Sequence, residues 1–178
     1  EDENFLAKRN RAKLFKLKNT SMTRTDSLQM ATVAVFEYLI GNTDWSVPYL
    51  HNIRLLYTPD DRLMPVPYDF DHSGIVEAKY ARPPELLELS SVRERLYRGI
   101  TYPPTLLQQV FDKFRQIKPQ LYALYQENPA LNPGYVKRTT RYLDDFYEVI
   151  NDPKAVKKFF ILGGGKDNAG VVIKGLNN

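Results

Sequence analysis

Residues 40–74 read IGNTDWSVPYLHNIRLLYTPDDRLMPVPYDFDHSG, and they carry the strongest signals in the chain. The segment before them, residues 26–40, is apolar nearly all round, which is typical of a helix buried in a core. Two short apolar runs, at residues 52–58 and 63–70, flank the sequence Pro-Asp-Asp-Arg, which is typical of a β-turn. We therefore predict a buried helix, a polar loop and a β-hairpin, in that order.

The polar residues of this stretch stand at the ends of the predicted segments. Asp44 lies in the loop, Asn52 begins the hairpin, and Asp69 and Asp71 end it. Because a hairpin brings its two ends to one edge of a sheet, we expect Asn52 and Asp69 to lie close together. Carboxylate and amide oxygens suit Mg²⁺, and phosphoryl transfer needs one carboxylate to orient the attacking hydroxyl and further oxygens to hold the metal. The pattern predicts a metal-phosphate site.

The runs IGNTD, HN followed by IRLLY, and VPYDFD resemble the catalytic half of atypical protein-kinase-like families, notably the HipA-type and CotH-type kinases, over residues 26–76. The resemblance implies an α+β fold, mainly helical, equivalent to the large, C-terminal lobe of a protein kinase with a central β-hairpin. An ATP-dependent phosphotransferase using Mg²⁺ or Mn²⁺ would follow, with a protein or small-molecule phosphoacceptor left open.

The same resemblance assigns roles to four residues. Asp44 would be the catalytic carboxylate, and Asn52 would bind the metal through its amide. Asp69 would be the metal- and nucleotide-binding Asp of the usual Asp-Phe-Gly motif. Asp71 would be the second Asp of a CotH-like pair and a further metal ligand.

Two features differ from the usual kinase pattern. Asn52 follows Asp44 by eight residues, whereas the usual catalytic loop places Asn five residues after Asp. No Gly-rich phosphate-covering loop and no strand Lys of the Val-Ala-Ile-Lys kind precede Asp44. We therefore expect either a fragment or a kinase-like protein without a small lobe, and weak binding of ATP by this chain alone.

Two alternatives stay open. A metal-dependent phosphohydrolase would use the Asp69-Phe70-Asp71 pattern, and His51 and His72 could join the acidic residues in an imidazole–carboxylate metal site. The other alternative is a non-catalytic, pseudokinase-like binding module. Independently of both, Asp69 and Asp71 could have a structural role, in which they cap a turn or bind a structural Ca²⁺. Release of free phosphate favours the first alternative, and absence of metal-nucleotide binding favours the second.

The composition restricts the class of protein further. The 178 residues contain no Cys, which excludes disulfides and thiolate metal sites and leaves the compartment undetermined. No apolar run reaches the roughly 18 residues of a membrane span. We expect a soluble protein without a membrane span; a location outside the cytoplasm, after removal of a targeting segment, is one option.

We divide the chain into a basic N-terminal segment (residues 1–25), a kinase-like catalytic lobe (26–162) and a Gly/Asn-rich tail (163–178). The first segment has seven basic and three acidic residues, which accounts for the whole net charge of +4, because the basic and acidic residues of the remaining chain cancel. We expect it to be an amphipathic, solvated segment, not a nucleic-acid-binding arm. The tail contains Gly-Gly-Gly-Lys without the Ser or Thr of a phosphate loop, and a short strand is expected at residues 171–174.

The remainder of the lobe has helix-start signals. Ser91 and Glu94 fit a capping box, which predicts a short helix over residues 91–98. Helices are also predicted to begin at the Pro103-Pro104, Asn132-Pro133 and Asp152-Pro153 pairs, with a kink or end at Pro119. Three basic residues lie soon after Asp69 and Asp71, namely Arg93, Arg95 and Arg98. We expect them to lie on an exposed helix face with ion pairs to Glu88 or Glu94, or to contact an acidic substrate or a phosphate.

Overall fold

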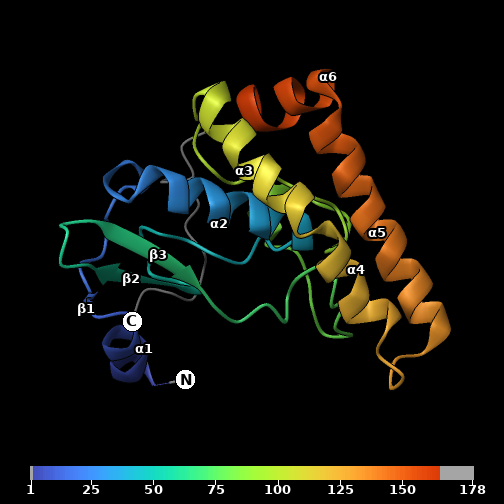
Figure 1. Ribbon diagram of the computed structural model, residues 1–178, viewed down its shortest axis with the longest axis horizontal. Helices are drawn as coiled ribbons and strands as arrows, with labels where there is room; N and C mark the ends of the chain where they lie inside the picture. The colour runs from blue at the N-terminus through green and yellow to red at the C-terminus, as the bar shows by residue number, and fades with distance from the viewer. Residues whose placement is uncertain (1, 165–178) are drawn as a thin grey trace.

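A computed structural model describes residues 2–164. Within this range the protein has six α-helices and one three-stranded antiparallel sheet, so the predicted α+β, mainly helical class is confirmed. The elements in chain order are α1 (Glu3–Arg9), β1 (Lys13–Phe15), α2 (Ser27–Ile40), β2 (Ile53–Tyr57), β3 (Leu63–Pro67), α3 (Pro104–Gln116), α4 (Lys118–Gln126), α5 (Pro133–Asn151) and α6 (Pro153–Val156). Figure 1 shows α2 between the sheet and the helices of the C-terminal half.

Helix α2 is the centre of the core, as its all-round apolar sequence predicts. Nine of its residues are buried, and it packs against β3 on one side and against α3 and α5 on the other. Asp26 caps its N-terminus by accepting a hydrogen bond from the backbone of Gln29 at 2.8 Å. Gly41 ends it with a φ of +67°, a conformation that glycine adopts without strain. The polar loop therefore starts at a defined point on the core.

The predicted hairpin is present as β2 and β3, which pair in register from Ile53 opposite Pro67 to Tyr57 opposite Leu63. The edge of β3 lies against the start of α2, where Asp26 and Gln29 bond the carbonyl groups of Leu63 and Pro65. Strand β1 extends the sheet on the other side of β2. The basic N-terminal segment therefore contributes a strand to the sheet, although Phe5 and Leu17 remain largely exposed.

The C-terminal half follows the Pro and Asn signals closely. Helix α3 ends at Gln116 and α4 begins at Lys118, with Pro119 in its first turn. Asn132 caps α5 and Asp152 caps α6, each ahead of a proline. The apolar stripe of α3 is buried. It consists of Leu107, Val110, Phe111 and Phe114.

The predicted helix over residues 91–98 is wrong. This segment forms turns and extended chain, and the Glu94 carboxylate accepts hydrogen bonds from Ser90, not from a helix N-terminus. The strand predicted at residues 171–174 lies outside the described residues, as does the tail beyond residue 164. None of the helices in residues 2–164 is long and apolar enough to cross a membrane.

Candidate functional site

The loop after α2 folds back on itself and brings residues 44 to 52 together. The Asn42 side chain accepts a hydrogen bond from the Asp44 backbone at 3.0 Å, which fixes the start of the loop. Ser46 and His51 then exchange backbone hydrogen bonds of 2.9 and 3.0 Å. The positive φ of Leu50 (53°) and of Asn52 (50°) turns the chain toward β2. These turns return His51 and Asn52 to the side of Asp44.

The Asp44 carboxylate is held by two neighbouring side chains. The imidazole Nε2 of His51 lies 3.0 Å from its Oδ1, and the Asn52 amide nitrogen donates to its Oδ2 at 3.2 Å and to its backbone carbonyl at 2.7 Å. Asn52 is buried, whereas about a fifth of the side-chain surface of Asp44 (22%) remains exposed. Asp44 is therefore oriented from within the protein and still reachable from solvent.

The buried guanidinium of Arg98 holds the backbone of the Asp44 loop. Arg98 is 3% exposed, and one of its nitrogens donates to the carbonyl groups of Thr43 and Trp45, the two neighbours of Asp44. Burial lowers the pKa of Arg98 to about 10, against the opposing negative charges of Asp44 and Glu37. Arg98 is still a cation at neutral pH, so it fixes the loop backbone and supplies positive charge beside Asp44.

Glu37 lies on the helix side of the same cluster. Glu37 is 1% exposed, and burial raises the pKa of its carboxyl to about 8, although the neighbouring Asn42 side chain and the charge of Arg98 act in the opposite direction. Neither carboxyl oxygen has a hydrogen-bond partner among the described residues. Glu37 is thus mostly protonated at neutral pH. The candidate site rests on a buried polar cluster of Glu37, Asn42 and Arg98 beneath the Asp44 loop.

The acidic pair at the end of the hairpin adjoins this loop. The backbone of Tyr68 donates to the carbonyl of Asn52 at 3.0 Å, which places Asp69 one residue from the backbone contact with Asn52. Asp69 is exposed and has a φ of +58°, a conformation that Asp tolerates better than most residues. Phe70 turns inward and packs edge-on against Phe36 of α2, with ring centroids 5.4 Å apart.

Asp71 points to a different partner. The hydroxyl of Tyr80 donates to its Oδ2 at 2.9 Å, and this hydrogen bond, with the charge of His72, lowers the pKa of Asp71. The chain then returns to the end of α2, where Gly74 bonds the carbonyl of Gly41 at 3.1 Å. Both acidic residues therefore lie on a segment that is tied at one end to Asn52 and at the other to α2.

The structure thus brings Asp44, His51 and Asn52 into direct contact. Asp69 follows Tyr68, whose backbone contacts Asn52. His72 does not join this group, because its ring faces the carbonyl of Arg82 and the ring of Tyr80. No group of three or more carboxylate or imidazole side chains that could hold a metal ion between them is found in residues 2–164. The imidazole–carboxylate cluster that combined both His residues is therefore not formed.

The three arginines after residue 90 have roles that the sequence did not predict. Arg95 stacks on the ring of Tyr142 at 3.6 Å and donates to the last carbonyl groups of α2, at Tyr38 and Leu39. Arg93 pairs with Glu77 at 3.0 Å, not with Glu88 or Glu94. With Arg98 buried under the loop, these side chains join distant segments, and the predicted exposed helix face is wrong. In this non-helical conformation of residues 91–98, Arg95 and Arg98 reach backbone carbonyl groups of α2 and of the Asp44 loop.

The sequence analysis missed Glu37, Asn42 and Arg98 as parts of the site. Glu37 had a usable signal, because it is the one charged residue inside the otherwise apolar α2. A carboxyl in such a position is buried with a polar partner or neutralised. Arg98 had no comparable signal, since its contacts join residues more than fifty positions apart in the chain.

Comparison with known proteins assigns no function to the chain, so a functional proposal must be argued from the geometry of the site. No protein-family model, curated protein or solved structure matches the chain.

Proposed function

We propose that this chain is the catalytic lobe of a kinase-like phosphotransferase that moves a phosphoryl group from ATP with the help of a divalent metal. The observation that carries the proposal is the loop in which Asp44 is held by His51 and Asn52 above the buried Arg98. A carboxylate that is oriented by its neighbours and open to solvent can accept a proton from an attacking hydroxyl. Asp44 is the catalytic residue in this proposal.

Asn52 and Asp69 have the donor atoms that the metal needs. Because the Asn52 nitrogen is directed at Asp44, its amide oxygen lies on the opposite branch and can serve as a ligand. Asp69 adds an exposed carboxylate. Asp71 can add a second one when its hydrogen bond from Tyr80 is broken. Oxygen donors of this kind fit Mg²⁺ or Mn²⁺, and the metal would neutralise the charge of the phosphates.

Asp69→Asn tests the metal site. This variant removes the charge while Asn keeps the positive φ of the position, so the fold should be preserved. Titration of Mn²⁺ into the full chain with ATP, followed by electron paramagnetic resonance, should show at least about a tenfold weaker site in the variant. Asp145→Asn, an exposed change on α5, is the control. Equal Mn²⁺ affinity in all three proteins would exclude Asp69 as a ligand.

A phosphohydrolase is the second candidate, because the His51–Asp44 pair, at 3.0 Å, is also an arrangement that can activate water. The two reactions differ in the fate of the phosphate of labelled ATP. A kinase-like lobe transfers it to a hydroxyl acceptor or to its own side chains, whereas a hydrolase releases it as inorganic phosphate. Asp44→Asn should abolish whichever reaction is observed.

A further inference from the structure

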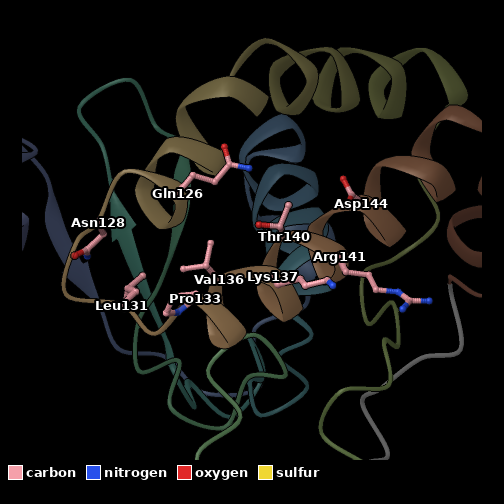
Figure 2. A pocket seen from close by; sticks show the side chains of 9 residues that line it. All are labelled: Gln126, Asn128, Leu131, Pro133, Val136, Lys137, Thr140, Arg141 and Asp144. Atoms are coloured by element: carbon pink, nitrogen blue, oxygen red, sulfur yellow. The ribbon is translucent and has the colours of Figure 1, made fainter.

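The second half of the molecule has a groove that the candidate site does not use. It lies between the end of α4, the connection that follows it and the first half of α5, and its volume is about 640 Å³. Figure 2 shows Gln126 of α4 across from Val136 and Thr140 of α5. A volume of this size accommodates several side chains of a bound segment.

The walls of the groove combine apolar surface with positive charge. Leu131, Pro133 and Val136 supply the apolar part. Lys137 and Arg141, one helical turn apart on α5, supply two exposed cations, and neither forms an ion pair with any residue between 2 and 164. Cations without a partner beside an apolar surface favour a ligand that brings both carboxylates and apolar side chains.

One acidic residue in the groove narrows the choice of ligand. Asp144 lines the same groove three residues after Arg141, and its carboxylate accepts a hydrogen bond from Tyr122 at 2.6 Å. A continuous phosphate backbone would meet this carboxylate and would gain nothing from the apolar wall. A peptide can place its acidic side chains at Lys137 and Arg141 and an apolar side chain against Val136.

We propose that the α4–α5 groove binds an acidic peptide segment, with spaced apolar residues, of a protein partner. Tyr135 of the same helix donates to the carbonyl of Ile75 at 3.3 Å, so the α5 wall is attached to the segment that follows Asp71. A partner bound in the groove is therefore held close to the chain that carries the candidate site. The inference concerns binding alone and holds whether or not the chain transfers phosphate.

Adjacent residues of α5 provide a matched test. Lys137 lines the groove, whereas Arg138 is exposed on the same helix and does not line it. Lys137→Glu and Arg138→Glu make the same change of charge, and both positions are exposed, so the fold should tolerate them. The probe is a fluorescein-labelled peptide rich in Glu with spaced Leu residues, and binding to the full chain is followed by fluorescence anisotropy.

We expect saturable binding to the unmodified chain, about fivefold weaker binding to Lys137→Glu and Arg141→Glu, and a change within about twofold for Arg138→Glu. Added salt should weaken the binding, because the cations are exposed. Absence of saturable binding, or an equal loss in Arg138→Glu, would overturn the proposal. Tighter binding of a single-stranded oligothymidylate than of the peptide would also overturn it, in favour of a nucleic-acid surface.

Discussion

At the scale of single residues, Glu37 is the group whose chemistry the fold alters most. Its pKa is about 8 in the folded protein, against an ordinary value of 4.5, because burial disfavours the carboxylate. The folded protein therefore retains a proton that the unfolded chain releases above pH 4.5. It follows that folding is favoured at low pH and that this advantage is lost as the pH rises through the interval between the two values.

Glu37→Gln should remove this pH dependence. In urea unfolding, the free energy of unfolding of the unmodified chain should fall relative to that of Glu37→Gln as the pH is raised from about 4.5 to about 8, and the difference should level off above that range. The expected size is a few kcal/mol at most, at about 1.4 kcal/mol for each pH unit. A constant difference between the two proteins from pH 4.5 to 8.5 would mean that Glu37 is ionised in the folded state throughout.

We expect the contributions of Arg98 and Glu37 to the free energy of unfolding to be coupled. Removal of a buried cation costs about 3–5 kcal/mol when it leaves an opposite charge uncompensated, and Glu37 carries such a charge only above its pKa of about 8. Arg98→Met also takes away the hydrogen bonds to Thr43 and Trp45, so it should destabilise the fold and loosen the Asp44 loop. When Glu37→Gln is added and unfolding is measured above pH 8, where Glu37 is ionised, the combined loss should be smaller than the sum of the two single losses, by about 0.5–3 kcal/mol. Strict additivity in this double-mutant cycle would show that the two side chains act independently.

At the scale of elements, the end of α2 is the point on which the site depends. Gly41 stops the helix, starts the loop that carries Asp44, and bonds Gly74 of the returning segment. A Cβ at this position would lie 2.0 Å from the hydroxyl of Tyr142. Helix α2, the Asp44 loop and the segment after Asp71 therefore meet at Gly41, where there is no room for a side chain.

Gly41→Ala should destabilise the protein by a few kcal/mol. The cost combines about 1–2 kcal/mol for a left-handed conformation with about 1–3 kcal/mol for overpacking. Thermal unfolding followed by circular dichroism measures it. Gly134→Ala is the control, because that residue lies in the first turn of α5 and a Cβ there meets only the Asn132 and Arg138 side chains. If both variants unfolded at the temperature of the unmodified chain, the close approach at Gly41 would be absent in solution.

At the scale of the whole molecule, the N-terminal segment is part of the sheet. Figure 1 shows α1 and β1 beside the hairpin, and Arg54 of β2 donates to Glu3 of α1 at 2.5 Å. The strand pairs Lys13 with Tyr57 and Phe15 with Leu55. The hairpin itself also packs on α2, so it has support that does not come from the N-terminal segment.

Removal of residues 1–16 should therefore weaken the fold without abolishing it. We expect a folded chain by circular dichroism, a lower urea midpoint, and faster hydrogen exchange at the amides of β2 that face β1. Lys13→Ala, which keeps the strand and changes one exposed side chain, should leave the midpoint nearly unchanged. An unfolded truncated chain would show that the sheet requires all three strands.

Local sequence was sufficient wherever a short segment carried its own physical signal. The apolar run of residues 26–40 predicted the buried α2, the Pro-Asp-Asp-Arg turn predicted the β2–β3 hairpin, and Asn-Pro and Asp-Pro pairs predicted the starts of α5 and α6. Burial of an apolar face, turn chemistry and capping act over a few residues. These three effects can therefore be predicted from the local sequence.

The tertiary structure alone determined where the polar side chains go. The capping-box pattern at Ser91 and Glu94 predicted a helix, yet the segment is not helical. Arg93 donates to the carbonyl of Gly74, Arg95 to that of Leu39 in α2, and Arg98 to that of Trp45 in the Asp44 loop. The burial of Glu37 likewise depends on how distant segments pack around α2. Asp44, in contrast, meets His51 and Asn52 through turns inside a single loop. A buried polar group normally forms a hydrogen bond within the fold. The sequence shows which residues are polar, but it does not show which distant residue will be the partner.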